Sequence, residues 1–241
     1  MTTVRDRSPR LRSVTLAGPE VEGLAVTEPA ASLRLLVPTD GHLELPGWNG
    51  NEFLFADGSR PPIRSVTPLA PEPGAGVVRV DVVLHGDGPM SAWARGAEVG
   101  DEVAISGPGR GYSVDPDASH VVLAGDESAL PAVTQLLGEL APDASVEVVL
   151  ETAHPDGRVE DLPAHPGATV RWVDQPAGQR SGSALVAWFE TWDVDPSARV
   201  WVAGEAAAVQ RIRTLLFGSG GIDRTRTVIR GYWKTGVAWD G

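Results

Sequence analysis

The hydrophobic pattern of the chain changes near residues 115–117. Beyond that point, apolar runs typical of buried strands alternate with amphipathic runs typical of helices. This alternation predicts a parallel sheet covered by helices on both faces. We therefore expect an α/β domain over residues 117–241. Its strands are expected at 120–124, 146–152, 170–173, 199–203 and 227–229, and its helices at 128–140, 183–189 and 206–216.

The residues before that point show strand patterns with little helix between them. Short stretches in which apolar and polar residues alternate, each followed by Gly or Pro, lie at 12–16, 32–37, 77–84 and 102–106. One short helix is expected at 88–94, because Pro89 lies near its start. Residues 39–62 give little periodic signal, and we read them as a long loop with one short strand at 52–55. Strands at this spacing predict a small antiparallel barrel or sandwich over residues 1–116.

Residues 125–133 lie where the first expected parallel strand passes into a helix. The N–H groups and the dipole at a helix start suit a phosphate or a carboxylate. Asp126, Glu127 and Ser128 also suit an ordinary N-cap, which is the other interpretation of this turn. Residues 204–205 follow a later strand in the same way. Ligands of parallel sheets bind at the carboxyl ends of the strands, so both turns are candidate binding segments, although the dinucleotide pattern G-x-G-x-x-G is absent.

The composition excludes several classes of protein. The chain has no cysteine and a formal net charge of −12. Without thiols, any redox chemistry needs a bound cofactor, and the negative charge argues against a nucleic-acid partner. No apolar run approaches the roughly 20 residues of a membrane helix, and we expect a cytoplasmic protein with no membrane partner. The five histidines have no metal-ligand spacing, so no metal site is expected.

Two further clusters each allow two interpretations. Residues 86–93 are either a turn and a capped helix within the β domain or a cradle for a pyrophosphate at the helix start. Residues 231–236 place Tyr232 and Trp233 beside Lys234, the only lysine of the chain. This cluster is either a packing plug with a solvated lysine or a cationic binding site.

Taken in order, these segments resemble the siderophore-interacting protein family, the flavin-dependent ferric-siderophore reductases of the ferredoxin-reductase-like superfamily. The resemblance covers nearly the whole chain. It rests on residues 60–68, 85–94, 125–133 and 201–205, and on the ending Gly-Tyr-Trp-Lys-x-Gly at 231–236. Ser128 stands where the family usually has Thr.

The resemblance implies an N-terminal barrel that holds FAD and a C-terminal α/β domain that binds NADPH or NADH. Hydride would pass to the flavin, and electrons would pass singly to ferric iron, which is released as Fe(II). Arg64 would pair with the flavin diphosphate, and Thr67 would lie near the reactive flavin nitrogen. The implied FAD-binding residues are Arg64, Val66, Thr67, Pro68, His85, Gly88, Pro89, Met90, Ser91 and Trp93. The implied nicotinamide-cofactor residues are Gly125, Asp126, Glu127, Ser128, Ala129, Leu130, Gly204, Glu205, Arg211 and Arg213.

The same resemblance gives the C-terminal cluster a role. Catecholate and carboxylate ferric siderophores are anionic, and an acidic protein must gather positive charge locally to receive them. Lys234, with Tyr232 and Trp233, is the expected substrate site, and Thr67 and Lys234 are the expected catalytic residues. The protein is expected to be a monomer whose partner is a ferric siderophore or another small molecule.

Val66 departs from the family pattern, which usually has a Tyr that stacks on the isoalloxazine ring. Loss of one aromatic contact worth about 0.5–1.5 kcal/mol weakens FAD binding up to about tenfold. Trp48 is an alternative stacking partner. Two alternative functions follow from this departure: a natural-product biosynthetic step with altered or absent flavin use, and non-catalytic binding of flavin or siderophore.

Overall fold

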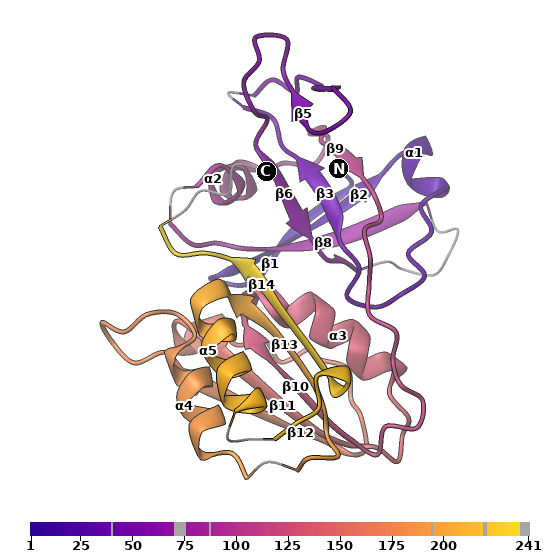
Figure 1. Ribbon diagram of the computed structural model, residues 1–241. Helices are drawn as coiled ribbons and strands as arrows, with labels where there is room; N and C mark the ends of the chain where they lie inside the picture. The colour runs from indigo at the N-terminus through magenta and orange to yellow at the C-terminus, as the bar shows by residue number, and fades with distance from the viewer. Residues whose placement is uncertain (40, 70–75, 87, 194, 219–220, 237–241) are drawn as a thin grey trace. The chain divides into compact units, whose positions relative to one another are not determined.

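The protein consists of two compact units, Met1–Tyr112 and Ser113–Val237. The structure is a computed structural model, and it describes residues 1–39, 41–69, 76–86, 88–193, 195–218 and 221–236 (Figure 1). No helix among these described residues is long and apolar enough to cross a membrane.

The first unit is built from antiparallel sheets. One sheet has the order β1-β2-β8-β7 and another has the order β6-β3-β9, and a separate hairpin joins β4 to β5. The strands are β1 (Thr3–Ser8), β2 (Leu11–Ala17), β3 (Leu33–Leu36), β4 (Gly47–Trp48), β5 (Phe53–Leu54), β6 (Ile63–Val66), β7 (Pro68–Leu69), β8 (Val77–Val83) and β9 (Ala104–Ser106), and the helices are α1 (Pro19–Glu22) and α2 (Pro89–Gly96).

The two larger sheets of this unit share one hydrophobic core. Val14 and Val80 from the first sheet, Leu33 and Leu35 from the second, and Trp93 from α2 belong to the same buried cluster. The expected antiparallel β fold is therefore confirmed. Alternate residues of a strand point to opposite faces, which explains why the period-two stretches of the sequence became the core strands.

Several elements of the first unit differ from the sequence expectation, and α1, β6 and β7 are among those that were not expected. β1 was not expected, because its residues are polar apart from Val4; it pairs with β2 from Thr3 opposite Thr15. The loop at 39–62 contains two strands rather than one. Trp48 of β4 lies opposite Phe53 of β5, with ring centroids 4.9 Å apart.

The second unit is a five-stranded parallel sheet of order β12-β11-β10-β13-β14. Its elements are β10 (His120–Asp126), η1 (Glu127–Ala129), α3 (Leu130–Glu139), β11 (Ser145–Thr152), η2 (Pro155–Gly157), β12 (Ala168–Asp174), α4 (Ser183–Thr191), β13 (Arg199–Glu205), α5 (Ala206–Phe217), η3 (Arg224–Arg226) and β14 (Thr227–Trp233). The expected parallel α/β fold is thereby confirmed.

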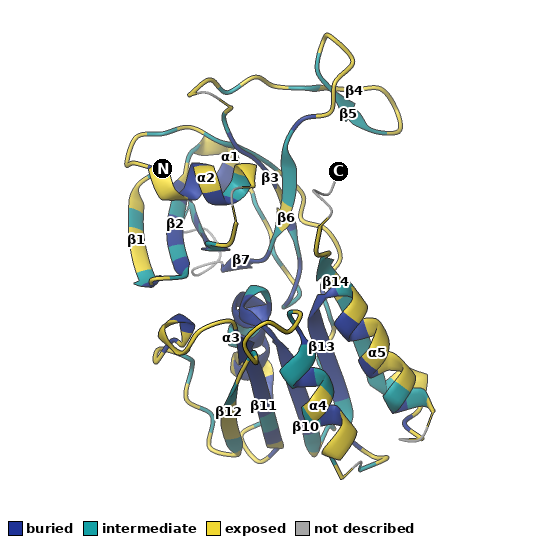
Figure 2. Ribbon diagram, turned by 90° about the vertical axis from the view of Figure 1, so that its left-hand side faces the viewer, coloured by how far each residue is buried: buried dark blue, intermediate teal, exposed yellow. Residues whose placement is uncertain are grey.

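Helices cover both faces of this sheet. Figure 1 shows α4 and α5 on one face and α3 on the other. Val122 and Val200 pack with Leu185 of α4 and Ile212 of α5 in one buried cluster. The strands β10, β11 and β13 are largely buried, whereas the outer sides of α4 and α5 are exposed (Figure 2). The order of the strands reverses between β10 and β13, and such a switch point is where sheets of this type bind ligands.

Two boundaries in the second unit correct the sequence expectation. The helix expected at 128–140 begins as the 3-10 turn η1, and α3 proper starts at Leu130 with Pro131 in its first turn. The strand expected at 227–229 continues to Trp233, because residues 230–233 pair with β13 although they lack an apolar pattern. This extension carries the C-terminal cluster to the carboxyl edge of the sheet.

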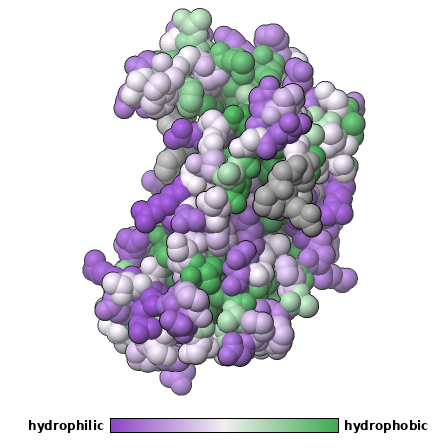
Figure 3. All heavy atoms as spheres, turned by 90° about the vertical axis from the view of Figure 1, so that its right-hand side faces the viewer, coloured by the Kyte–Doolittle hydropathy of each residue, from purple (hydrophilic) through white to green (hydrophobic). Residues whose placement is uncertain are grey.

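The surface is mixed in character. On the face shown in Figure 3, groups of apolar residues lie between hydrophilic ones. Leu45, Trp48, Val99 and Val170 are the large hydrophobic side chains most exposed among the described residues. Scattered apolar residues of this kind are normal on a globular protein.

An ion pair between His120 and Asp195 joins the start of β10 to the turn before β13. His120 Nδ1 lies 2.9 Å from Asp195 Oδ2, and Ser197 donates through its amide (2.8 Å) and its hydroxyl (2.7 Å) to Asp195 Oδ1. The bond from His120, followed by those from Ser197, lowers the pKa of Asp195 from 3.8 to about 2. Because the pKa of Asp195 is lowered in the folded protein, the contact stabilises the fold fully at pH values above 3.8. This stabilisation is lost as the pH falls to about 2.

We expect an NMR titration to give the Asp195 carboxyl a midpoint of about 2 and His120→Ala to move it upward towards its ordinary value. Asp57, whose pKa is lowered by Ser59, serves as the internal control and keeps its midpoint in His120→Ala. A midpoint of Asp195 near its ordinary value in the unsubstituted protein would contradict the hydrogen bond from His120.

Candidate functional site

The two turns expected to bind a ligand lie side by side at the switch point. β10 and β13 are parallel neighbours, with Gly125 opposite Ala203, and they end at Asp126 and Glu205. Both carboxylates are buried, at 7% and 5% exposure. The structure therefore brings residues 125–130 and 204–205 together at the carboxyl edge of the sheet.

The Asp126 carboxylate is the centre of this edge. Its Oδ1 accepts hydrogen bonds from the amide (2.9 Å) and the hydroxyl of Ser128. Its Oδ2 accepts from the amide of Glu205 (2.9 Å) and from Nε1 of Trp233 (2.8 Å). One side chain thus joins the ends of β10, β13 and β14. Burial raises the pKa of Asp126 above its ordinary value, although these hydrogen bonds act in the opposite direction.

Two glycines make room for this arrangement. A Cβ on Gly125 would lie 2.3 Å from Cβ of Ala129 and 2.5 Å from the carbonyl oxygen of Ala203. Gly204 has a φ of +151°, and a Cβ there would lie 2.6 Å from Oδ2 of Asp126. Only glycine allows the strands and the turn to approach this closely.

Glu127 and Glu151 complete the row of buried carboxylates. Oε1 of Glu127 accepts from the hydroxyl of Thr152 at 2.7 Å. Glu151, at the end of β11, accepts from the amides of Gly182, Ala184 (2.8 Å) and Leu185 (3.0 Å). Burial raises the pKa of Glu151. Sequence reasoning missed Glu151 and Thr152, although a carboxylate directly after a buried apolar strand is a usable signal.

The carboxylates of this edge cap helix starts. Glu151 accepts from amides in the first turn of α4, Glu205 accepts from Ala207 (2.7 Å) and Ala208 (3.0 Å) at the start of α5, and Asp126 caps η1. An amide that donates to a protein carboxylate is not offered to a phosphate. The geometry therefore favours the N-cap interpretation of residues 125–133 over the phosphate interpretation. These side chains do not form a metal site, since no group of three or more His, Asp or Glu among the described residues is arranged to hold an ion.

The C-terminal cluster lies at the same edge. Tyr232 is half-buried and packs edge-on against Trp201, with centroids 6.3 Å apart. Trp233 is half-buried, and Lys234 is exposed. The indole of Trp233 is thus held by Asp126, while the lysine side chain reaches solvent.

Arg211 and Arg213 lie away from the turn at residues 125–130. Both are exposed residues of α5. Arg211 pairs with Glu190 of α4 at 3.2 Å, and Arg213 donates to the carbonyl of Ile229 of β14 at 3.3 Å. At a rise of about 1.5 Å per residue, Arg211 is about 9 Å along the helix from Glu205. The structure does not bring these arginines to the turn at 125–130.

In the first unit, α2 begins at the segment expected to bind phosphate. Its N-cap is Gly88, Pro89 follows, and the first turn contains no acidic residue. Ser91 is buried, and its hydroxyl donates to the carbonyl of His85 at 2.8 Å and accepts from the amide of His85 at 3.2 Å. Among the described residues, no side chain caps the start of α2, and the same holds for α3, whereas Glu151 and Glu205 accept from the first amides of α4 and α5.

The other expected FAD segment forms β6 and β7. Val66 lies opposite Leu33 and packs against the core that also contains Trp93, with Met90 at its edge. The buried residues Thr67 and Pro68 follow directly. Arg64 is half-buried and donates to the carbonyl of Ile63 at 2.8 Å. Both FAD segments therefore rest on one core.

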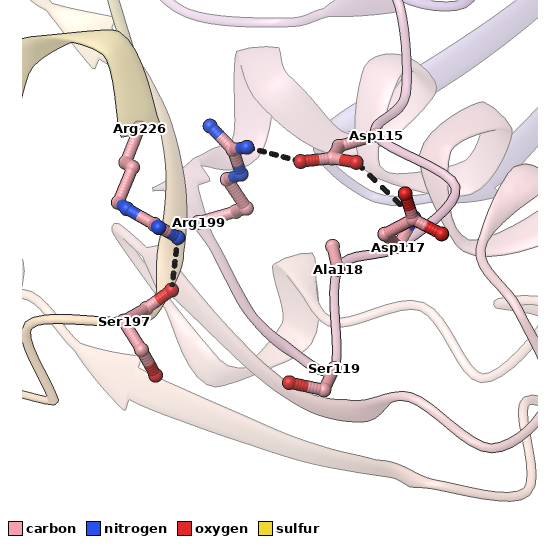
Figure 4. A pocket seen from close by; sticks show the side chains of 7 residues that line it. All are labelled: Asp115, Asp117, Ala118, Ser119, Ser197, Arg199 and Arg226. Carbon is pink, nitrogen blue, oxygen red and sulfur yellow. Dashed lines mark hydrogen bonds and ion pairs between the residues drawn. The ribbon is translucent and has the colours of Figure 1, made fainter.

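A separate cavity of about 350 Å³ lies at the amino ends of the strands of the second unit. It is lined by Asp115, Asp117, Ala118, Ser119, Ser197, Arg199 and Arg226 (Figure 4). Its two arginines are already engaged, Arg199 with Asp115 and Arg226 with the carbonyl of Ser197. We therefore place the functional site of this unit at the opposite, carboxyl edge.

Together, the antiparallel unit and the parallel unit define a two-domain protein with the ferredoxin-reductase-like fold. The chain belongs to the siderophore-interacting protein family. The model of the siderophore-interacting FAD-binding domain matches residues 1–112, and that of the siderophore-interacting protein matches residues 118–236.

Individual proteins are similar to this chain over most of its length. The chain is 34% identical to the uncharacterized protein Rv2895c of Mycobacterium tuberculosis over 76% of its own length and 69% of the relative's. It is 26% identical to the ferric vibriobactin reductase ViuB of Vibrio cholerae over 95% and 86% of the two chains. A siderophore utilization protein from T. fusca superposes with a TM-score of 0.85 at 32% identity, covering 98% and 91%.

The close packing around Gly125 predicts a stability effect. Gly125→Ala should lower the free energy of unfolding by about 1–3 kcal/mol, because the added methyl group overlaps Ala129 and the Ala203 carbonyl. Gly138→Ala on α3, where nothing lies within 4 Å of the new atom, should raise it by about 0.5–1 kcal/mol. Denaturant unfolding measures both, and equal effects of the two substitutions would contradict the packing described.

Proposed function

We propose that the protein is an FAD-dependent oxidoreductase that uses NADPH or NADH to reduce a ferric siderophore and release Fe(II). The observation that carries the proposal is Lys234, an exposed cation at the carboxyl edge of the switch-point sheet in a chain with a net charge of −12. Membership of the family and the similarity to a ferric vibriobactin reductase support it.

The first unit fits FAD. The start of α2 offers main-chain N–H groups and the positive end of a helix dipole, and a glycine cap leaves the approach open. A Cβ at Gly88 would meet no atom within 4 Å, so a phosphate of the cofactor can come close. We assign Arg64 to the diphosphate and the Thr67 hydroxyl to the reactive flavin nitrogen. The chemistry that a bound FAD supplies links a hydride donor to one-electron acceptors, so that one NAD(P)H and two Fe(III) give NAD(P)⁺, two Fe(II) and one H⁺.

The turn at residues 125–130 is proposed to face the nicotinamide rather than the phosphates of NADPH or NADH. Its buried carboxylates accept bonds from the protein's own amides, hydroxyls and indole. A carboxylate held in this way fixes the shape of the turn and excludes a phosphate from it. Arg211 and Arg213, exposed residues of α5, are the proposed contacts for the distant end of the cofactor.

The C-terminal cluster is proposed to receive the substrate. An anionic ferric complex needs a local cation, because the chain as a whole repels it. Lys234 supplies the charge, and Tyr232 and Trp233 supply aromatic surface beside it. Reduced nicotinamide is a metabolite of the cytoplasm, and we infer that the protein acts there as a monomer.

The purified protein should take up FAD and become yellow. Anaerobic NADPH or NADH should bleach the flavin absorbance, and a ferric catecholate should restore it while an Fe(II)-specific chelator develops colour. The visible spectrum records every step. A colourless protein that cannot be loaded with FAD would contradict the proposal.

Val66 gives a second prediction. Val66→Tyr adds the ring that the family pattern has at this position and should tighten FAD binding up to about tenfold. Ser65→Tyr is the matched control, because neighbouring residues of a strand point to opposite faces. Fluorescence titration with FAD measures both.

The same titration addresses the second candidate, a natural-product biosynthetic step with altered flavin use, which Val66 motivates. That candidate is removed if Val66→Tyr leaves FAD affinity and the reductase rate unchanged and the unsubstituted protein already reduces ferric siderophores. Binding of flavin or siderophore without oxidation of NADPH or NADH in the presence of any ferric acceptor would indicate a non-catalytic binder instead.

A further inference from the structure

The residues on both sides of Lys234 are hydrogen-bonded to buried carboxylates. Before it, Nε1 of Trp233 donates to Oδ2 of Asp126 at 2.8 Å. After it, the amide of Thr235 donates to Oε1 of Glu205 at 3.2 Å. Asp126 is 7% exposed and Glu205 is 5% exposed, so both anchors lie inside the fold although the lysine is outside it.

The two anchors are themselves fixed. Asp126 also accepts from Ser128 and from the amide of Glu205, each at 2.9 Å. The second oxygen of Glu205 accepts from Ala207 at 2.7 Å and from Ala208 at 3.0 Å. Each carboxylate thus has a fixed orientation, set by the end of its strand and by the start of the following turn or helix.

The pairing of β14 directs Trp233 towards Asp126. Gly204 lies opposite Gly231, but Glu205 lies opposite Trp233, so Tyr232 is an extra residue in the ladder. A bulge of this kind changes the direction in which the following side chains point. The local geometry of β14 therefore serves the contact between the indole and the carboxylate.

We propose that Asp126 and Glu205 are positioning residues for Lys234, and that they act through the Trp233 indole and the Thr235 amide. They hold the lysine backbone at the carboxyl edge, so that its ammonium group is preorganised for an anionic oxygen of the ferric complex. A preorganised group loses less freedom on binding and binds more tightly. The inference rests on the proposed substrate site, and it concerns binding of the complex rather than electron transfer to it.

Calorimetric titration with gallium(III) tris-catecholate tests this proposal on the full chain. This trianionic probe resembles a ferric catecholate and cannot be reduced under these conditions. Lys234→Met should weaken binding about tenfold, and Trp233→Phe, which keeps a ring but removes the N–H donor, about three- to tenfold. The double variant should bind no more weakly than Lys234→Met alone, because Trp233 acts through the lysine. Trp192→Phe, at the end of α4, is the matched control and should bind like the unsubstituted protein.

Additive losses in the double variant, equal behaviour of Trp233→Phe and Trp192→Phe, or no effect of Lys234→Met would each overturn the proposal. Glu205→Gln gives a second route if Trp233→Phe is unstable. Its amide oxygen can still cap Ala207 and Ala208, but its NH₂ group faces the Thr235 amide, so it should weaken binding and show the same lack of additivity with Lys234→Met.

The test is separate from that of the proposed function. Binding of gallium catecholate needs neither flavin nor reduced nicotinamide. A protein that binds the probe with the predicted coupling but forms no Fe(II) would refute the reductase and keep the positioning role. A protein that forms Fe(II) but shows additive effects of Trp233→Phe and Lys234→Met would refute the positioning role and keep the reductase.

Discussion

The carboxylate of Asp126 is the contact on which the carboxyl edge of the parallel sheet depends. It is buried, pairs with no cation among the residues that the structure describes, and accepts bonds from Ser128, Glu205 and Trp233. Hydrogen bonds to a charged group each contribute about 1.5–3 kcal/mol, which offsets much of the cost of burial. The raised pKa shows that the offset is incomplete. The protein therefore retains an energetically costly group that joins three strand ends.

The start of α2 differs from the starts of α4 and α5, although α3 of the second unit, like α2, has no side-chain cap. In the second unit, α4 and α5 begin on Glu151 and Glu205, so their amides are occupied by the protein's own carboxylates. In the first unit, α2 begins on Gly88 with no acidic residue in its first turn. This difference supports the assignment of cofactor phosphate to α2 and of an uncharged ring to the turn after β10. Lys234 is an exposed cation at this carboxyl edge.

Much of the fold could be predicted from the sequence, because buried strands and amphipathic helices leave periodic signals. The switch from antiparallel to parallel structure and the turn at residues 125–130 were predicted in this way, whereas the family was identified from the resemblance of whole motifs such as residues 231–236. β1 was missed because its residues are mostly polar. The length of β14 was underestimated because pairing with β13, rather than apolar residues, extends it to Trp233. The bond between Trp233 and Asp126 spans 107 residues, and no local pattern predicts such a contact.

The exchange rate of the Trp233 indole proton tests the central claim most directly. If the indole donates to a buried carboxylate, NMR should show its Nε1 proton exchanging with solvent at least about tenfold more slowly than that of Trp48, which is 55% exposed. In Asp126→Ala, which removes both carboxylate acceptors, the protection should be lost. Equal exchange of Trp233 and Trp48 in the unsubstituted protein would contradict the account.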